Sequence, residues 1–420
     1  MQAVYVRATG AGTGGIAAFV LDGWGLAAKL QPLWQSKREI RLSQRGDLCQ
    51  GKLLDRGGKA LDEAVLAFLS SNETSTGFEQ IELCCHGGIG IAAAVEAELE
   101  HAGFERAAGR ELLFRAHLNH KLPLTAVEAR LLLPRAATSR QAEFLLGHET
   151  FRKKWERIGF DAAMGMRSGD SAWREQARAA ARDACERAPG ALALLRRHAV
   201  VLAGNVNAGK STLANRLARA ERHIVSALPG TTRDRLETPL NLRGLELALS
   251  DTAGLRESDD SVEREGQRRA RAALESADLR VIVLDASKPP ENSELDLIKT
   301  CNALGPSLTV LNKADLGLHE AAQGLGFLAG TEPLPISARD GTGIEPLEQA
   351  IESALLGGIV PLAGDAFSAR QIALLQEICD DIEHGFEDTM SIRCIVKLCA
   401  TRGNAEQLAQ VVDDWKLHKF

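Results

Sequence analysis

The chain has 420 residues, 45% of them apolar, which is enough for two or three domains that each bury a core. Its formal net charge of −6 excludes a uniformly basic surface, so any contact with nucleic acid must be local. The 8 cysteines lack metal-site spacing, and the sequence shows neither a signal peptide nor an apolar run of about 18 residues. We therefore expect free thiols, a cytoplasmic protein and no membrane span.

Short apolar runs separated by glycine pairs characterise residues 1–116, and this pattern predicts an α+β domain. Cys84 and Cys85 stand directly before His86-Gly87-Gly88. A metal-ligand cluster would use such residues, but a strand that runs into a glycine turn explains them better.

Residues 117–195 are rich in Ala, Arg, Glu and Leu and carry few strand signals, which predicts a helical domain. The basic stretch Phe151–Arg157 and the pair Arg196-Arg197 are candidate contacts for RNA. A solvated helix face accounts for them at least as well.

Residues 196–357 alternate strand and helix signals, as an α/β domain does. The apolar run His198–Ala203 leads into Gly204-Asn205-Val206-Asn207-Ala208-Gly209-Lys210-Ser211, which fits the phosphate-loop pattern G-x-x-x-x-G-K-[ST] at every fixed position. Backbone N–H groups of such a loop surround phosphates at a helix N-terminus. Lys210 would reach the β- and γ-phosphates, and the Ser211 hydroxyl would bind Mg²⁺.

Two further segments are placed to sense the γ-phosphate. Asp251-Thr252-Ala253-Gly254 follows the strand-like run Leu245–Ser250. Asp251 would hold Mg²⁺ through water, and the Gly254 amide would bond the γ-phosphate. Upstream, Thr232 is the candidate for a second hydroxyl on Mg²⁺.

The base is indicated by two segments that follow later in the chain. Asn312-Lys313-Ala314-Asp315 comes after the apolar run Leu308–Leu311. The Asp315 carboxylate would accept from the ring N–H and the exocyclic amine of guanine, and adenine offers neither in that arrangement. Ser337-Ala338-Arg339 would add a backbone donor to the guanine oxygen. Together these segments predict that the nucleotide is GTP.

The residue after D-x-x-G is Leu255, where Ras-type enzymes carry a glutamine that orients water. Asn207, with the loop from Ser226 to Thr231, would face K⁺ beside the phosphates, and Glu263 would polarise the attacking water. The alternative for Glu263 is one of several solvated acids in a charged loop.

Helical patterning returns after the glycine pair at 357–358, with Ile372, Leu375 and Ile378 at three-residue spacing. Helical segments on both sides of an α/β module predict that the module is inserted into one discontinuous helical domain. The predicted fold is multidomain α/β and α, with the boundaries 1–116, 117–195, 196–357 and 358–420.

The chain resembles the MnmE/TrmE tRNA-modification GTPases. Besides the G-domain motifs, Glu82–Gly88 is similar to the family's E-L-x-x-H-G-G and Arg115–Leu122 to its R-A-x-L-N-x-K-L. Ala8-Thr9 with Gly14-Gly15 resembles the family's A-T-P-x-G-x-G-G opening. The two longer N-terminal motifs are the specific ones, because related K⁺-dependent GTPases share the G-domain motifs.

The resemblance implies an N-terminal folate-binding-like α+β domain and a helical domain interrupted by a Ras-like P-loop G domain. It implies a cytoplasmic homodimer that uses a tetrahydrofolate derivative, and a flavin-dependent partner of the MnmG/GidA type, to modify the wobble uridine of tRNA.

The resemblance also assigns roles to single residues of this chain. By matching position, K⁺ ligands are Asn207, Ser226, the Leu228 carbonyl and Thr231, and Glu263 is the water-activating residue. Glu82 and Lys121 match folate contacts.

The residues predicted to bind GTP are Asn207, Ala208, Gly209, Lys210, Ser211, Thr212, Ser226, Ala227, Leu228, Pro229, Gly230, Thr231, Thr232, Asp251, Thr252, Ala253, Gly254, Asn312, Lys313, Ala314, Asp315, Ser337, Ala338 and Arg339.

The sequence departs from the family pattern at several places, one of which is Gly109-Arg110-Glu111-Leu112 in place of the family's P-G-E-F. Val20 stands where the family has an arginine, the loop Gly10–Thr13 is not proline-rich, and Asp414–Phe420 differs from the family's cysteine-bearing F-C-I-G-K tail. These departures leave an alternative open, a K⁺-dependent GTPase switch or ribosome-assembly factor that has lost the modification chemistry.

Overall fold

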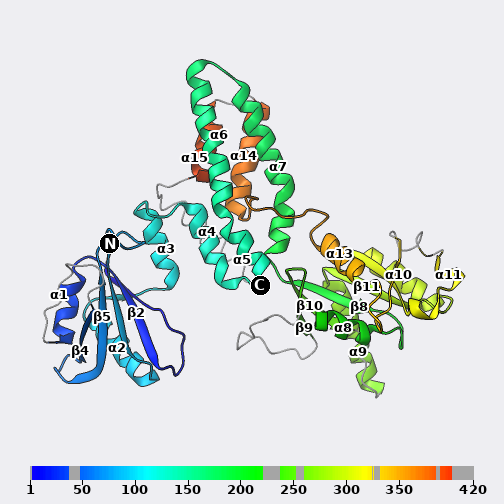
Figure 1. Ribbon diagram of the computed structural model, residues 1–420, viewed down its shortest axis with the longest axis horizontal. Helices are drawn as coiled ribbons and strands as arrows, with labels where there is room; N and C mark the ends of the chain where they lie inside the picture. The colour runs from blue at the N-terminus through cyan, green and yellow to red at the C-terminus, as the bar shows by residue number, and fades with distance from the viewer. Residues whose placement is uncertain are drawn as a thin grey trace. The chain divides into compact units, whose positions relative to one another are not determined.

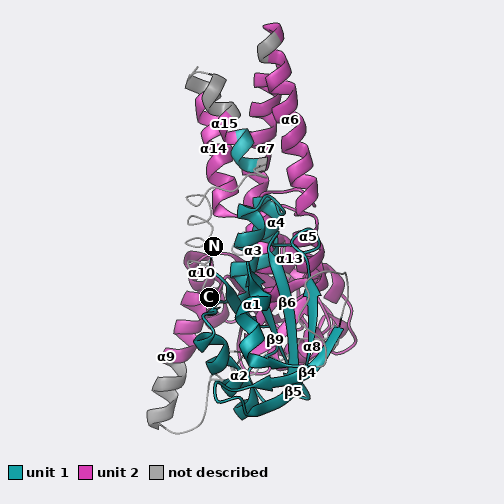
Figure 2. Cartoon of the chain, turned by 90° about the vertical axis from the view of Figure 1, so that its left-hand side faces the viewer, with its two compact units in different colours: residues 1–131, 395–420 teal, residues 132–394 magenta. Residues whose placement is uncertain are grey.

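The computed structural model describes residues 2–36, 48–220, 237–251, 260–323, 325, 332–384 and 388–399. The chain separates into two compact units, residues 1–131 with 395–420 and residues 132–394 (Figure 2). Within the described ranges, every helix is too short or too polar to span a membrane.

A seven-stranded sheet forms the body of the first unit (Figure 1), in the order β3-β4-β5-β6-β2-β1-β7. Neighbouring strands are antiparallel except β1 and β7, which are parallel. The strands are β1 (Val4–Arg7), β2 (Ile16–Gly23), β3 (Trp34–Gln35), β4 (Leu48–Leu54), β5 (Ala60–Leu69), β6 (Glu79–His86) and β7 (Glu105–Arg106).

The core of this sheet lies on one face, where alternate apolar side chains of β2, β5 and β6 are buried, starting from Ala17, Ala64 and Ile81. Helices α1 (Leu26–Leu30) and α2 (Ile89–His101) pack against that face, and Phe19, Leu66 and Leu83 lie in the shared core. The alternate side chains face the other way, and Ile16, Leu48 and Val65 are 62%, 66% and 37% exposed. Glu82 belongs to this second face.

Helices dominate residues 109–194 and 369–399, the segments before and after a second sheet. They are α3 (Gly109–Leu118), α4 (Leu124–Leu132), α5 (Ser139–Leu146), α6 (His148–Ser168), α7 (Ala172–Leu194), α14 (Ala369–His384) and α15 (Asp388–Cys399). In the second unit α7 packs against both α6 and α14 (Figure 1). The buried face of α7 is lined by Ala177, Ala181 and Ala184, whose small side chains permit close helix packing.

A six-stranded sheet with the order β13-β12-β11-β8-β10-β9 completes the second unit. All its neighbouring strands are parallel except the β9–β10 hairpin. Its strands are β8 (His198–Ala203), β9 (Glu237–Leu242), β10 (Leu245–Asp251), β11 (Leu279–Asp285), β12 (Ser307–Asn312) and β13 (Leu334–Pro335). Its helices are α8 (Lys210–Ala220), α9 (Asp260–Ser276), α10 (Asn292–Leu304), α11 (Glu320–Gln323) and α13 (Ile344–Leu355).

The central strand β11 is buried without alternation from Leu279 to Leu284, as expected of a parallel strand that is covered on both faces. The carboxyl ends of β8, β11 and β12 lie at one edge, the place where open α/β sheets bind ligands. The predicted fold class, α/β and α in several domains, is confirmed. The three predicted domain boundaries, after residues 116, 195 and 357, stay predictions.

Candidate nucleotide-binding site

The phosphate loop joins β8 to α8 and depends on two glycines. A Cβ atom on Gly204 would lie 2.2 Å from the Val283 carbonyl oxygen, and one on Gly209 would lie 2.2 Å from the Asn312 amide nitrogen. Both glycines have positive φ, 150° and 93°, as does Asn207 at 69°. The loop therefore needs glycine at both ends and a residue that tolerates the left-handed region in between.

Lys210 is the first residue of α8, and its side chain folds back over the loop. Its ammonium donates to the carbonyls of Gly204 and Asn205, at 2.9 Å each, and the residue is 4% exposed. A cation held beside a helix N-terminus and a glycine-rich turn attracts phosphate oxygens.

Ser211 and Asp251 meet across the edge of the sheet. The Ser211 hydroxyl donates to the Asp251 carboxylate at 2.6 Å. The strand register between β10 and β8 explains this contact. Asp251 pairs with Leu202 near the end of β8, and Ser211 lies in the first turn of α8, the helix after that strand. A hydroxyl and a carboxylate are the oxygen ligands that suit Mg²⁺, so these two residues fit that ion.

Asn312, at the carboxyl end of β12, connects the two nucleotide loops. Its amide nitrogen donates to the Ala208 carbonyl at 2.8 Å, and its amide oxygen accepts from the Ala338 N–H at 2.9 Å. The residue is 2% exposed. One buried side chain thus fixes the phosphate loop relative to Ser337-Ala338-Arg339.

Lys313 and Asp315 follow in a turn that opens with positive φ at Lys313, 66°. The Lys313 ammonium donates to the Asp285 carboxylate at 2.7 Å. Burial alone would raise the pKa of Asp285, but hydrogen bonds from Lys313 and Ser287 lower that pKa below its usual value. Asp315 itself is exposed, in the short 3-10 helix Ala314–Leu316.

Several predicted site residues lie outside the described part of the chain. They are Ser226, Ala227, Leu228, Pro229, Gly230, Thr231, Thr232, Thr252, Ala253 and Gly254. Glu263 belongs to α9, but its side chain is also outside the described part. Among the described candidates, the geometry brings together the phosphate loop with Lys210, Ser211, Asp251, Asn312 and Ala338.

The predicted folate contacts lie in the first unit. Glu82 is exposed on β6, and its direct cross-strand neighbours are Val20 on β2 and Ala67 on β5. The position where the resembled family has an arginine is therefore directly opposite Glu82. Lys121 follows α3, and its Cε atom lies close to Gly77.

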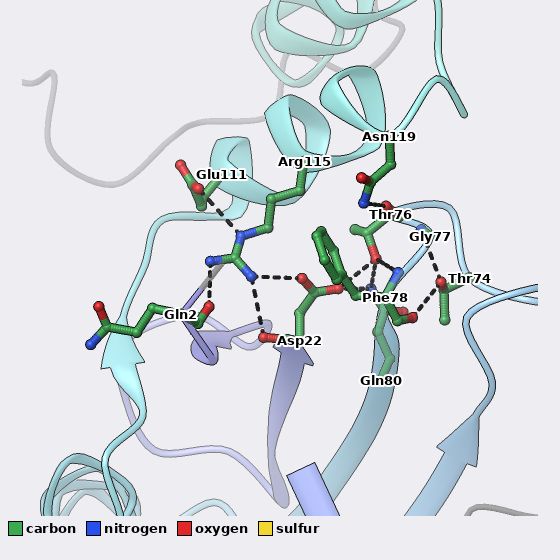
Figure 3. Close-up of polar contacts among 10 residues, drawn as sticks. All are labelled: Gln2, Asp22, Thr74, Thr76, Gly77, Phe78, Gln80, Glu111, Arg115 and Asn119. Atoms are coloured by element: carbon green, nitrogen blue, oxygen red, sulfur yellow. Dashed lines mark hydrogen bonds and ion pairs between the residues drawn. The ribbon is translucent and has the colours of Figure 1, made fainter. Parts of the chain in front are cut away.

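Sequence reasoning missed the buried polar network around Asp22 (Figure 3). Asp22 is 0% exposed and accepts from Arg115 Nη1 at 3.0 Å, Thr76 Oγ1 at 2.5 Å and Gln80 Nε2 at 2.9 Å. Asn119 donates to the Thr76 carbonyl at 2.7 Å. The arginine and asparagine of the R-A-x-L-N motif thus attach α3 to the sheet. The available signal was an aspartate at the end of an apolar strand, since a buried charge needs partners.

The E-L-x-x-H-G-G motif also has a structural role. The Asp62 carboxylate accepts from the His86 ring at 2.7 Å and from the His86 N–H at 2.8 Å. Gly87 exchanges backbone hydrogen bonds with Gly14 and Gly15, and a Cβ on Gly87 would lie 2.4 Å from the Gly14 carbonyl oxygen. The two glycine motifs are therefore side by side, and β6 runs directly into Gly87, which agrees with the predicted strand before a glycine turn.

The basic stretch Phe151–Arg157 is largely paired with acids. Arg152 contacts Glu156, Lys153 lies 3.5 Å from Glu149, and Lys154 lies 3.6 Å from Asp183. This pairing favours a solvated helix face over an RNA contact.

The site described so far, with a phosphate loop, a Ser–Asp pair and a strand-end asparagine, defines a P-loop GTPase. Consistent with this, residues 199–313 match the model of a family described as 50S ribosome-binding GTPase. Residues 3–121 match a second model, described as GTP-binding protein TrmE N-terminus.

Relatives that match over most of their length identify the family. The chain is 33% identical to the tRNA modification GTPase MnmE of Parasynechococcus marenigrum, over 83% of this chain and 80% of that protein. It is 34% identical to the tRNA modification GTPase MnmE of Chloroflexus aurantiacus, over 85% and 82%. A solved structure of Aquifex aeolicus Era bound to GDP·AlF4⁻ is 24% identical, covers 43% of this chain and 65% of its own, and has a TM-score of 0.32. The chain belongs to the MnmE family and is a GTP-hydrolysing enzyme that uses GTP and Mg²⁺.

Proposed function

We propose that this chain hydrolyses GTP to drive modification of the wobble uridine of tRNA, of the 5-carboxymethylaminomethyl or aminomethyl type, with a flavin-dependent partner of the MnmG/GidA type. The observation that carries the proposal is the match to MnmE proteins over most of both chains, joined to the Ser211–Asp251 and Asn312 geometry. The setting is the cytoplasm.

In the nucleotide site, Lys210 binds the β- and γ-phosphates and Ser211 binds Mg²⁺ together with Thr232. Asp251 holds the ion through water. This assignment is supported by the 2.6 Å contact of Ser211 with Asp251, since it brings the hydroxyl ligand and the carboxylate that holds the water together.

In the base site, Asp315 accepts from the ring N–H and the 2-amine of guanine, and Ser337-Ala338-Arg339 supplies a backbone donor to O6. Support comes from Asn312, which holds the loop of these donors against the phosphate loop. A site that pairs with guanine in this way leaves the Asp315 carboxylate unpaired when adenine covers it.

For hydrolysis, K⁺ is held by Asn207, Ser226, the Leu228 carbonyl and Thr231, and Glu263 polarises the attacking water. Asn207 lies inside the phosphate loop with its backbone in the left-handed region, φ 69°. The cation offsets negative charge that develops on the phosphates.

A tetrahydrofolate derivative binds the first unit at Glu82 and Lys121, and two copies of the chain form a homodimer through that unit. The exposed apolar side chains Ile16, Leu48 and Val65 on one sheet face favour a second copy as the cover. The four-part division at 116, 195 and 357 fits this arrangement, with the G domain inserted between helices that pack together.

One observation favours a second candidate function. Val20, directly opposite Glu82, offers no charge to a folate carboxylate. A GTPase switch or ribosome-assembly factor that has lost the modification chemistry would need no such charge.

Mass spectrometry of wobble nucleosides in tRNA from cells lacking the chain separates the two. Loss of a 5-substituted uridine, restored by the wild-type chain but not by Ser211→Ala, is the result expected from the proposal. An unchanged nucleoside profile, with GTP hydrolysis by the purified chain intact, would establish the second candidate.

A further inference from the structure

Arg216, on α8, donates two hydrogen bonds to the loop that follows β13. Its Nε donates to the Ala338 carbonyl at 3.1 Å, and its Nη2 donates to the Arg339 carbonyl. The helix that starts at the phosphate loop is thereby linked to the loop assigned to the guanine oxygen, over a separation of 122 residues between Arg216 and Ala338.

Holding these two carbonyls fixes the direction of the amides that follow them. A trans peptide is planar, so the N–H of Arg339 points opposite to the Ala338 carbonyl and therefore away from Arg216. Likewise the Asp340 N–H points away from Arg216, and it donates to Ser337 Oγ at 3.3 Å. The Ala338 N–H is already donated to Asn312. The Arg339 N–H is thus the oriented backbone donor of this loop.

The rest of the loop is a turn that is closed by its own hydrogen bonds, and Arg216 links this turn to α8. The Ser337 N–H donates to the Thr342 carbonyl at 2.9 Å and the Gly341 N–H to the Ser337 carbonyl at 2.8 Å. Gly341 has a φ of 99°, and a Cβ there would lie 3.5 Å from Arg216 Nη1. Hydrogen bonds from Thr342 and Ser337, and then the charge of Arg216, lower the pKa of Asp340.

We propose that Arg216 is a positioning residue for guanine recognition, which holds the Arg339 N–H towards the O6 atom of the base. The inference rests on the proposed base site. On this proposal, recognition of O6 depends on Arg216 of α8. Recognition of the ring N–H and the 2-amine depends separately on Asp315.

Three diphosphates separate these contributions in the purified full-length chain, by competition against a fluorescent GDP. GDP offers every group, IDP lacks the 2-amine but keeps O6, and 6-thio-GDP keeps the amine but carries sulfur, a weak acceptor, at position 6. Arg216→Ala should weaken GDP and IDP by about tenfold each, the effect of one lost hydrogen bond, and 6-thio-GDP by less than about twofold.

The affinity of Arg216→Lys for GDP should lie between those of wild type and Arg216→Ala. A lysine ammonium replaces a guanidinium group that donates to two carbonyls at once. The control Arg271→Ala removes an equal charge from an exposed part of α9, where the arginine side chain is 83% exposed, and should bind as wild type. Equal weakening of all three ligands by Arg216→Ala, or no weakening, would overturn the inference. If Asp315→Asn leaves GDP and IDP unchanged, the base site itself is wrong, which is a separate result.

Discussion

Arg140 at the start of α5 and Glu352 near the end of α13 form an ion pair, with 2.5 Å between Nη1 and Oε1, across 212 positions of the chain. Arg243, in the turn between β9 and β10, donates Nε to the other oxygen of the same carboxylate at 2.6 Å. Arg140 also donates to the Arg243 carbonyl at 2.8 Å. The β9–β10 hairpin, which ends at Asp251, is thus attached to α5, a helix of the helical segment that precedes the α/β sheet.

Glu352→Ala should lower the free energy of unfolding by about 1–3 kcal/mol, because it removes the carboxylate that two half-buried guanidinium groups share. Burial by itself would raise the pKa of Glu352, but hydrogen bonds from Arg243 and Arg140 lower that pKa below its usual value. The contribution is therefore complete above about pH 5 and is lost as the pH falls through the lowered pKa. Urea unfolding of wild type and variant at pH 7 and pH 3.5 measures this. A difference between them that is as large at pH 3.5 as at pH 7 would contradict it.

Gly244, in the same turn, has a φ of 85°, and a Cβ there would lie 2.6 Å from two carbons of Arg140. Gly358 has a φ of 76° with nothing within 4 Å of its Cβ position. Both alanine variants carry the backbone strain, about 1 kcal/mol, but only Gly244→Ala should displace Arg140. We expect Gly244→Ala to be less stable than Gly358→Ala by a further 1 kcal/mol or more, roughly the effect of overpacking. Equal melting curves for the two variants would contradict this, because they would show that Arg140 moves away from the added methyl group without a loss of stability.

The sequence alone predicted the phosphate loop, the strands that carry it and the segment Asn312–Asp315, because each is a local pattern with a fixed structural context. It could not predict the pairing of Arg140 with Glu352 or of Arg115 with Asp22. Those contacts join distant segments, and arginine and acid residues are common on solvated helices, so nothing local distinguishes them. The predicted roles of Glu263 and of Ser226–Thr232 stay predictions, since they fall outside the described side chains.

Asp315→Asn should weaken GTP by about tenfold or more and admit xanthosine triphosphate, because an amide can donate to the oxygen at position 2 of xanthine. Affinities measured by competition for both nucleotides test this. Asp340→Asn is the matched control, since Asp340 is exposed nearby and is bonded to Thr342 rather than proposed to touch the base. Unchanged GTP affinity in Asp315→Asn would remove Asp315 from the base site.

Hydrolysis should be several-fold faster in K⁺ than in Na⁺ at equal ionic strength, because the larger ion fits between the phosphates and the proposed oxygen ligands. Asn207→Gly removes the ligand and keeps the left-handed backbone of 69° without strain. That variant should lose the preference for K⁺ while still binding GDP. Equal wild-type rates in the two salts would eliminate the cation from the mechanism.

Glu263→Ala should leave nucleotide affinity intact and lower kcat by about 100-fold or more, since a group that polarises water acts only on the chemical step. Glu275 is the matched control, because it lies on the same helix and its side chain is half exposed beside Arg271. Glu275→Ala should therefore hydrolyse GTP at the wild-type rate. Single-turnover hydrolysis in K⁺, measured together with GDP affinity, separates chemistry from binding. A near-normal rate in Glu263→Ala would mean that Glu263 is one of the solvated acids of α9 and that another group activates the water.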